Sequence, residues 1–106
     1  MTPAPPQPAA EQLVLVDLLA ALSDPVRLEL VRRLGDGAEH ACAAFHGLGG
    51  LSVPTLSHHL RVLREAGLTD TRVDGKHRYI TLRAVDVERR FPGLLAAVIA
   101  AAPLSS

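Results

Sequence analysis

The chain has 106 residues, a mass of 11.2 kDa and no net charge at neutral pH, which is the size of a single domain. Apolar residues make up 48% of the chain and charged residues 21%, a balance that excludes a disordered protein. The single cysteine excludes an internal disulfide, and no apolar stretch is long enough to cross a bilayer, so we expect a cytoplasmic protein without membrane contact.

The N-terminal third predicts a tail followed by two helices. Four prolines within residues 1–10 predict a disordered tail, so the folded domain is expected over residues 11–106. Residues 13–22 are apolar around most of a helical circumference, which predicts a helix that is buried on more than one side. Ser23-Asp24-Pro25 then has the order of a helix cap followed by a first-turn proline, and it predicts a second helix that ends near Gly35.

The middle of the chain predicts a short helix and then a longer one. Residues 39–46 are expected to form the short helix, which a glycine-rich turn closes. Ser52 is a suitable cap for the longer helix, and Gly67 is a suitable end. The leucines of this helix recur at helical spacing on one side, which leaves polar residues on the other.

The C-terminal third predicts a hairpin and a last helix. Residues 69–73 and 76–82 are rich in β-branched residues and are joined at Asp74-Gly75, a strong hairpin signal. A last helix is expected over about residues 84–102, with Pro92 as a kink or a restart. The resulting fold class is mainly α with a small β-hairpin: a winged helix-turn-helix of about five helices and a two-stranded wing.

This order of elements places a polar helix face beside a basic hairpin. Six basic and three acidic residues lie in residues 52–83, whereas residues 1–51 hold three basic and six acidic ones. A helix of this kind fits the major groove of DNA, and hairpin cations can contact phosphates. The residues expected to bind DNA are Pro54, Thr55, Ser57, His58, Arg61 and Arg64 on the helix, and Arg72, Lys76, His77 and Arg78 on the hairpin. His59 flanks the leucine stripe and is expected to be a partly buried structural residue.

Three blocks resemble the ArsR family of small bacterial repressors: residues 21–34 (ALSDPVRLELVRRL), 51–68 (LSVPTLSHHLRVLREAGL) and 72–79 (RVDGKHRY). The resemblance spans roughly residues 12–83 and keeps the order of the family's blocks. It implies a winged-helix protein that binds double-stranded operator DNA as a homodimer and is released by an inducer. It also implies that the helix from Ser52 reads DNA and that the first and last helices form the dimer.

The apolar residues of the first and last helices support a shared dimer core, because a chain this short has many aliphatic residues to bury. The residues expected at the dimer interface are Leu13, Val16, Leu19, Leu94, Leu95 and Val98.

A metal-sensing role is not expected. Metal-responsive members of the family often carry a Cys-x-Cys motif before the recognition helix, whereas residues 39–46 hold one cysteine. His40, Cys42 and His46 are weak ligand candidates, and no histidine follows His77. We therefore expect no cofactor and no metal site, and the inducer is unknown. Cys42 has three interpretations: a small buried residue, a redox or electrophile sensor, and a metal ligand.

Two other classes of function compete with DNA binding. No phosphate-binding loop, pair of cleft carboxylates or Cys/His dyad indicates an enzyme, so enzymatic activity is not expected. A winged helix that docks a protein instead of DNA is an alternative, as is a thiol-responsive regulator that acts through Cys42.

Overall fold

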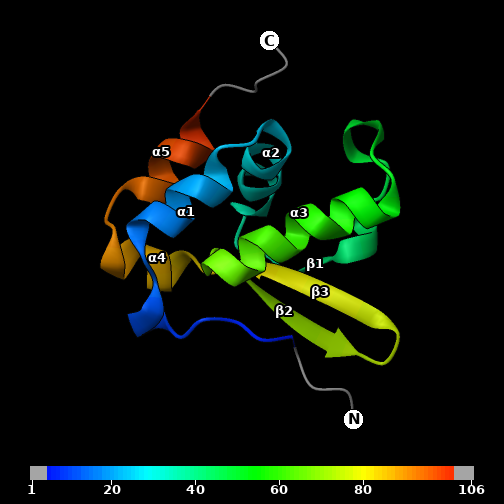
Figure 1. Cartoon of the computed structure of the whole chain (residues 1–106), viewed down its shortest axis with the longest axis horizontal. Helices are drawn as coiled ribbons and strands as arrows, with labels where there is room; N and C mark the ends of the chain where they lie inside the picture. Colours follow the sequence, from blue (N-terminus) through cyan, green and yellow to red (C-terminus); the bar gives the residue numbers. More distant parts are fainter. Residues whose placement is uncertain (1–4, 102–106) are drawn as a thin grey trace.

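The computed structural model describes residues 5–101 and contains five α-helices and three strands (Figure 1). The helices are α1 Leu15–Leu22, α2 Pro25–Leu34, α3 Val53–Ala66, α4 Ala84–Arg90 and α5 Leu94–Ala100. The strands are β1 His40–Ala41, β2 Thr69–Asp74 and β3 His77–Leu82, in an antiparallel sheet of order β1-β3-β2. Short 3-10 turns cover Ala10–Gln12, Cys42–Phe45 and Leu48–Gly50. The predicted fold class, mainly helical with a hairpin wing, is confirmed.

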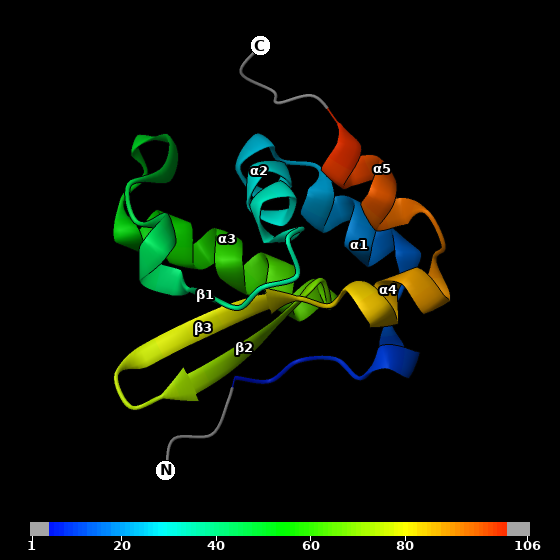
Figure 2. The same ribbon diagram turned by 180° about the vertical axis from the view of Figure 1, so that it is seen from behind.

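The core lies between the helices and one face of the sheet. Leu30, Leu56 and Leu63 of α2 and α3 are almost fully buried, and Ile80 and Leu82 of β3 face them from the sheet. In both views α3 lies over the hairpin, and α1, α4 and α5 gather at the end of the molecule away from the hairpin tip (Figures 1 and 2). The polar side of α3 and the wing are therefore at one end, and the terminal helices at the other.

The predicted helix starts are confirmed at α2 and α3. The Asp24 carboxylate accepts hydrogen bonds from the backbone N–H groups of Val26 and Arg27, at 2.9 and 3.1 Å, and Pro25 occupies the first turn. The Ser52 hydroxyl accepts from the Thr55 N–H at 3.4 Å. These local caps explain why both helices begin where the sequence indicates.

The predicted helix over residues 39–46 is wrong. His40 and Ala41 instead form β1, which pairs with Ile80 and Tyr79 of β3, and a 3-10 turn over Cys42–Phe45 follows. β3, the central strand, supplies the backbone partners of this segment, and those partners lie too far away in the chain to be predicted from the segment itself. The sheet therefore has three strands, one more than the hairpin predicts.

The expected last helix is divided. α4 ends at Arg90 and α5 begins at Leu94, with Pro92 between them. Proline lacks an N–H and disfavours helical backbone at the preceding residue, so the chain restarts here, as the sequence suggested. The end expected near residue 102 lies outside the described residues.

Residues 5–10 differ from the disordered tail that their prolines predict. They run beside β2 and enter the 3-10 turn at Ala10, and Gln7 and Pro8 accept hydrogen bonds from the folded domain (Figure 2). These partners lie more than 60 residues away in the chain, so composition gives no sign of them. Within residues 5–101, no helix is long and apolar enough to cross a membrane.

Candidate nucleic-acid interface

The outer face of α3 is polar and exposed. Leu56 and Leu63 turn into the core, whereas Pro54, Thr55, Ser57, His58 and Arg61 are all exposed. One Arg61 Nη atom lies 3.3 Å from His58 Nδ1, so the two side chains form one group at the centre of this face. The helix has 14 residues and is about 21 Å long, which suits a major groove about 12 Å wide.

His59 joins α3 to α2. Its side chain is 12% exposed, and its Nδ1 lies 3.0 Å from Arg27 Nη1 and 3.8 Å from Asp24 Oδ2. Arg27 also donates from Nε to the Ala21 carbonyl at 2.6 Å. These contacts connect the start of α2 with the middle of α3, in line with the structural role expected for His59.

The hairpin distributes its cations over two faces. Arg72 pairs with Tyr79, so these two side chains share a face of the sheet. Side chains alternate along a strand, so Arg78, the residue before Tyr79, lies on the opposite face from Arg72. Arg78 shares the face of the buried Ile80, which is the α3 side. Lys76 and His77 are exposed at the tip.

Arg72 is held by an acidic residue of the chain itself. Its Nε and Nη2 atoms donate to the two Glu39 carboxylate oxygens at 2.9 and 2.8 Å, and its guanidinium lies 4.6 Å from the centre of the Tyr79 ring. Arg72 lowers the pKa of the Glu39 carboxyl, which therefore stays ionised. A DNA phosphate would have to displace Glu39 to reach Arg72, which makes Arg72 the least suitable of the hairpin candidates.

Arg64 lies between α3 and the wing. It is half-buried, and its Nε is buried without an acceptor among the described residues. Burial lowers the pKa of Arg64; the neighbouring Glu65 opposes this shift, whereas Arg78 and Arg61 add to it. Three arginines, with Glu65 among them, therefore lie near one another where α3 meets the wing, and their net charge is positive.

The weak metal-ligand candidates do not converge. His40 Nε2 lies 2.9 Å from Asp36 Oδ2, and the exposed His46 follows the 3-10 turn that contains Cys42. Burial raises the pKa of the half-buried Cys42 thiol, although Arg78 and Arg64 oppose it, so a reactive thiolate is not favoured. Among residues 5–101, no three His, Cys, Asp or Glu side chains gather as a metal site would need.

The residues expected at a dimer interface fall into two groups. Val16 and Leu19 on α1 are 69% and 47% exposed, and the adjoining Val14 and Leu15 are exposed as well. Leu13 and Leu95 are already buried in the chain's own core, so they have almost no surface left for a partner. Leu94 and Val98 on α5 are half-buried.

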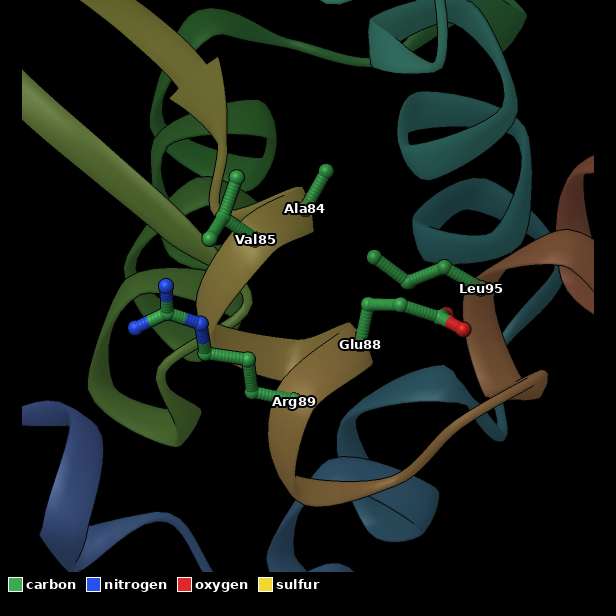
Figure 3. Close-up of a pocket in the computed structure, with 5 residues that line it drawn as sticks. All are labelled: Ala84, Val85, Glu88, Arg89 and Leu95. Atoms are coloured by element: carbon green, nitrogen blue, oxygen red, sulfur yellow. The ribbon is translucent and has the colours of Figure 1, made fainter.

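An apolar hollow that sequence reasoning missed lies beside α4 and α5. Its volume is about 450 Å³, and it is lined by Ala84, Val85, Glu88, Arg89 and Leu95 (Figure 3). Val85 is 65% exposed. α4 holds two valines, the buried Val87 and the exposed Val85, and no local sequence signal marks Val85 as part of a hollow.

Two successive helices, the second presenting a polar face beside a basic hairpin, define a winged helix-turn-helix DNA-binding domain. Residues 22–72 match a family model described as a helix-turn-helix domain. The uncharacterized HTH-type transcriptional regulator YceK of Bacillus subtilis is 34% identical over 87 residues, which cover 81% of this chain and 87% of that protein.

Two further relatives carry names that describe a function. The arsenical resistance operon repressor of Staphylococcus xylosus is 42% identical over 66 residues, which cover 61% of this chain and 62% of that protein. The fold is similar to the crystal structure of the transcriptional repressor BigR from Xylella fastidiosa, with a TM-score of 0.63 and 36% sequence identity. The match covers 82% of this chain and 86% of that one. The chain belongs to the ArsR family of winged helix-turn-helix transcriptional regulators.

Proposed function

We propose that the protein is a sequence-specific repressor that binds operator DNA as a homodimer and is released by an inducer. The observation that carries the proposal is the polar face of α3, centred on Arg61 and His58, with Arg64 and Arg78 beside it. The repressor names of two relatives support it.

The parts of the interface have different roles in this proposal. The hydroxyls of Thr55 and Ser57 and the side chains of His58 and Arg61 face the base edges of the major groove, where they select sequence. Pro54 lies in the first turn of the same face. Arg64, Lys76, His77 and Arg78 lie where α3 meets the wing or at its tip and contact phosphates, which adds affinity without selecting sequence.

A duplex selected from a random-sequence pool by the wild-type protein tests the proposal. We expect the protein to prefer this selected duplex over a mixed-sequence duplex of equal length. Its affinity should fall as salt rises, with a log–log slope of about −0.9 for each phosphate contact. If the wild-type protein bound no duplex even at low salt, the chain would instead be a protein-interaction module without DNA binding.

The dimer is proposed to form through the apolar surface of α1. Leu19→Glu would place a charge in that contact, and burying an unpaired charge is strongly unfavourable. We expect light scattering to show a dimer for the wild-type protein and a dimer that is weaker by on the order of a hundredfold for Leu19→Glu.

Val53→Glu is the matched control, because Val53 is 50% exposed against 47% for Leu19 but lies at the start of α3. This variant should remain a dimer. A monomeric wild-type protein at micromolar concentration would contradict the proposed assembly.

A further inference from the structure

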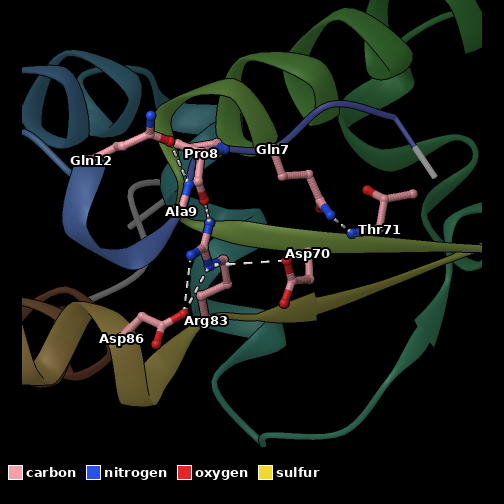
Figure 4. A network of polar contacts seen from close by, with 8 residues as sticks. All are labelled: Gln7, Pro8, Ala9, Gln12, Asp70, Thr71, Arg83 and Asp86. Carbon is pink, nitrogen blue, oxygen red and sulfur yellow. Dashed lines mark hydrogen bonds and ion pairs between the residues drawn. The ribbon is translucent and has the colours of Figure 1, made fainter.

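We propose that residues 7–13, here the N-terminal strap, are a positioning element that fixes the wing relative to α3 and thereby contributes to DNA affinity. The inference rests on the proposed function and adds residues that lie outside the DNA-contacting surface. Its central observation is that the strap contacts three parts of the domain: the outer edge of β2 and the junction after β3 (Figure 4), and the end of α3.

The first contact is with the edge of the wing. β2 is an outer strand of the sheet, so its N–H groups on that side have no strand partner. The Thr71 N–H donates to Gln7 Oε1 at 2.6 Å, halfway along β2. β1 pairs only with Tyr79 and Ile80 of β3, so the outer part of the wing has two strands, and an added edge contact restricts how far it can move.

The second contact is with Arg83, at the junction of β3 and α4. Its side chain is 6% exposed, and it donates from Nη1 to the Pro8 carbonyl at 2.6 Å. Its Nε and Nη2 atoms donate to Asp86 Oδ2 at 3.2 and 3.0 Å, and Asp70 Oδ1 of β2 lies 3.9 Å from Nε. Arg83 therefore connects the strap, the base of the wing and α4 within one buried guanidinium group (Figure 4).

The third contact is with the end of the DNA-reading helix. A Cβ on Gly67, which follows α3, would overlap Leu13 Cδ2 and would lie 3.1 Å from Pro8 Cγ. Arg90 of α4 fixes the same part of the strap by donating to the Leu13 carbonyl at 3.0 Å. One short segment is thus held against both the helix and the hairpin that the proposed function brings to DNA.

This arrangement affects binding through preorganisation. A wing that moves freely must be ordered when Arg78 and Lys76 meet phosphates, and that ordering reduces affinity. The strap orders the wing in the free protein. A purely stabilising strap would raise resistance to unfolding but would leave the affinity for DNA unchanged.

The test compares Gln7→Met and Gln7→Glu in the full chain. Methionine keeps the length of the side chain but cannot accept from the Thr71 N–H, whereas glutamate can. We expect faster amide exchange at Thr71 in Gln7→Met and wild-type exchange in Gln7→Glu. For Gln7→Met we also expect the selected duplex to bind about three- to tenfold more weakly, and the salt slope to fall by up to about one phosphate contact.

Ser23→Ala is the control, since it also removes one hydrogen bond, from the Ser23 hydroxyl to the Ala20 carbonyl at 2.8 Å, far from the wing in sequence. Its duplex affinity should equal that of the wild-type protein. Unchanged Thr71 exchange in Gln7→Met would overturn the inference, as would faster exchange with wild-type affinity and salt slope. A wild-type protein that bound no duplex would overturn the proposed function itself.

Discussion

Replacing Arg61 with alanine should weaken binding to the selected duplex roughly 5- to 150-fold, which corresponds to about 1–3 kcal/mol for a side chain that contacts a base. Arg61 is exposed at the centre of the α3 face, and its guanidinium lies beside His58. The loss should be larger for the selected duplex than for a mixed-sequence duplex, because a base contact carries sequence preference. Titrations of both duplexes at one salt concentration measure this difference.

Arg72→Ala is the matched control, since it also removes one arginine, but from the face of the wing that points away from α3. Its guanidinium is paired with Glu39, so its loss should change affinity for either duplex by about threefold at most. If Arg72→Ala weakened binding as much as Arg61→Ala, the outer face of the wing would have to contact DNA, and the proposed docking of α3 would be wrong.

Gly67→Ala should reduce the free energy of unfolding by about 2–5 kcal/mol. Gly67 has a φ of +95°, in the left-handed region that costs other residues about 1–2 kcal/mol. Its new methyl group would also overlap Leu13 Cδ2, and because Leu13 is 1% exposed there is no space into which it can move, which adds about 1–3 kcal/mol. Urea unfolding at a fixed protein concentration measures the loss.

Gly75→Ala separates the two causes. Gly75 has a φ of +60°, but no atom lies within 4 Å of its added Cβ, so only the backbone cost of about 1–2 kcal/mol applies. A Gly67→Ala variant no less stable than Gly75→Ala would show that Leu13 does not pack against the end of α3.

The sequence predicted those elements whose signals are local. α3 is specified by the Ser52 cap and by leucines at helical spacing, and the hairpin by Asp74-Gly75 between β-branched runs. The exposed polar face of α3 follows from the same spacing. Caps, turns and periodicity involve neighbours within about four residues, so they can be read without knowing the fold.

The remaining features depend on partners that are distant in the chain. β1 exists because His40 pairs with Ile80, 40 residues later, and the residues of β1 carry no strong strand signal of their own. Arg72 reaches Glu39, 33 residues earlier, and Gln7 reaches Thr71, 64 residues later. Arg83 is one of the six basic residues of the segment 52–83, yet its side chain is buried and is bonded to Pro8 and Asp86. A charge count does not distinguish a surface cation from one that is used internally.

Because Arg72 and Arg78 lie on opposite faces of the wing, the changes of length that the wing can tolerate during evolution are limited. Inserting a single residue into β3 between Arg78 and Ile80 would turn either the tip side chains or the buried ones to the opposite face. Insertion of two residues into each of β2 and β3 would preserve both faces and lengthen the hairpin by one repeat of the pleat. Functional descendants of this protein should therefore gain or lose wing residues in pairs, with odd changes confined to the turn around Gly75 or absorbed by a bulge.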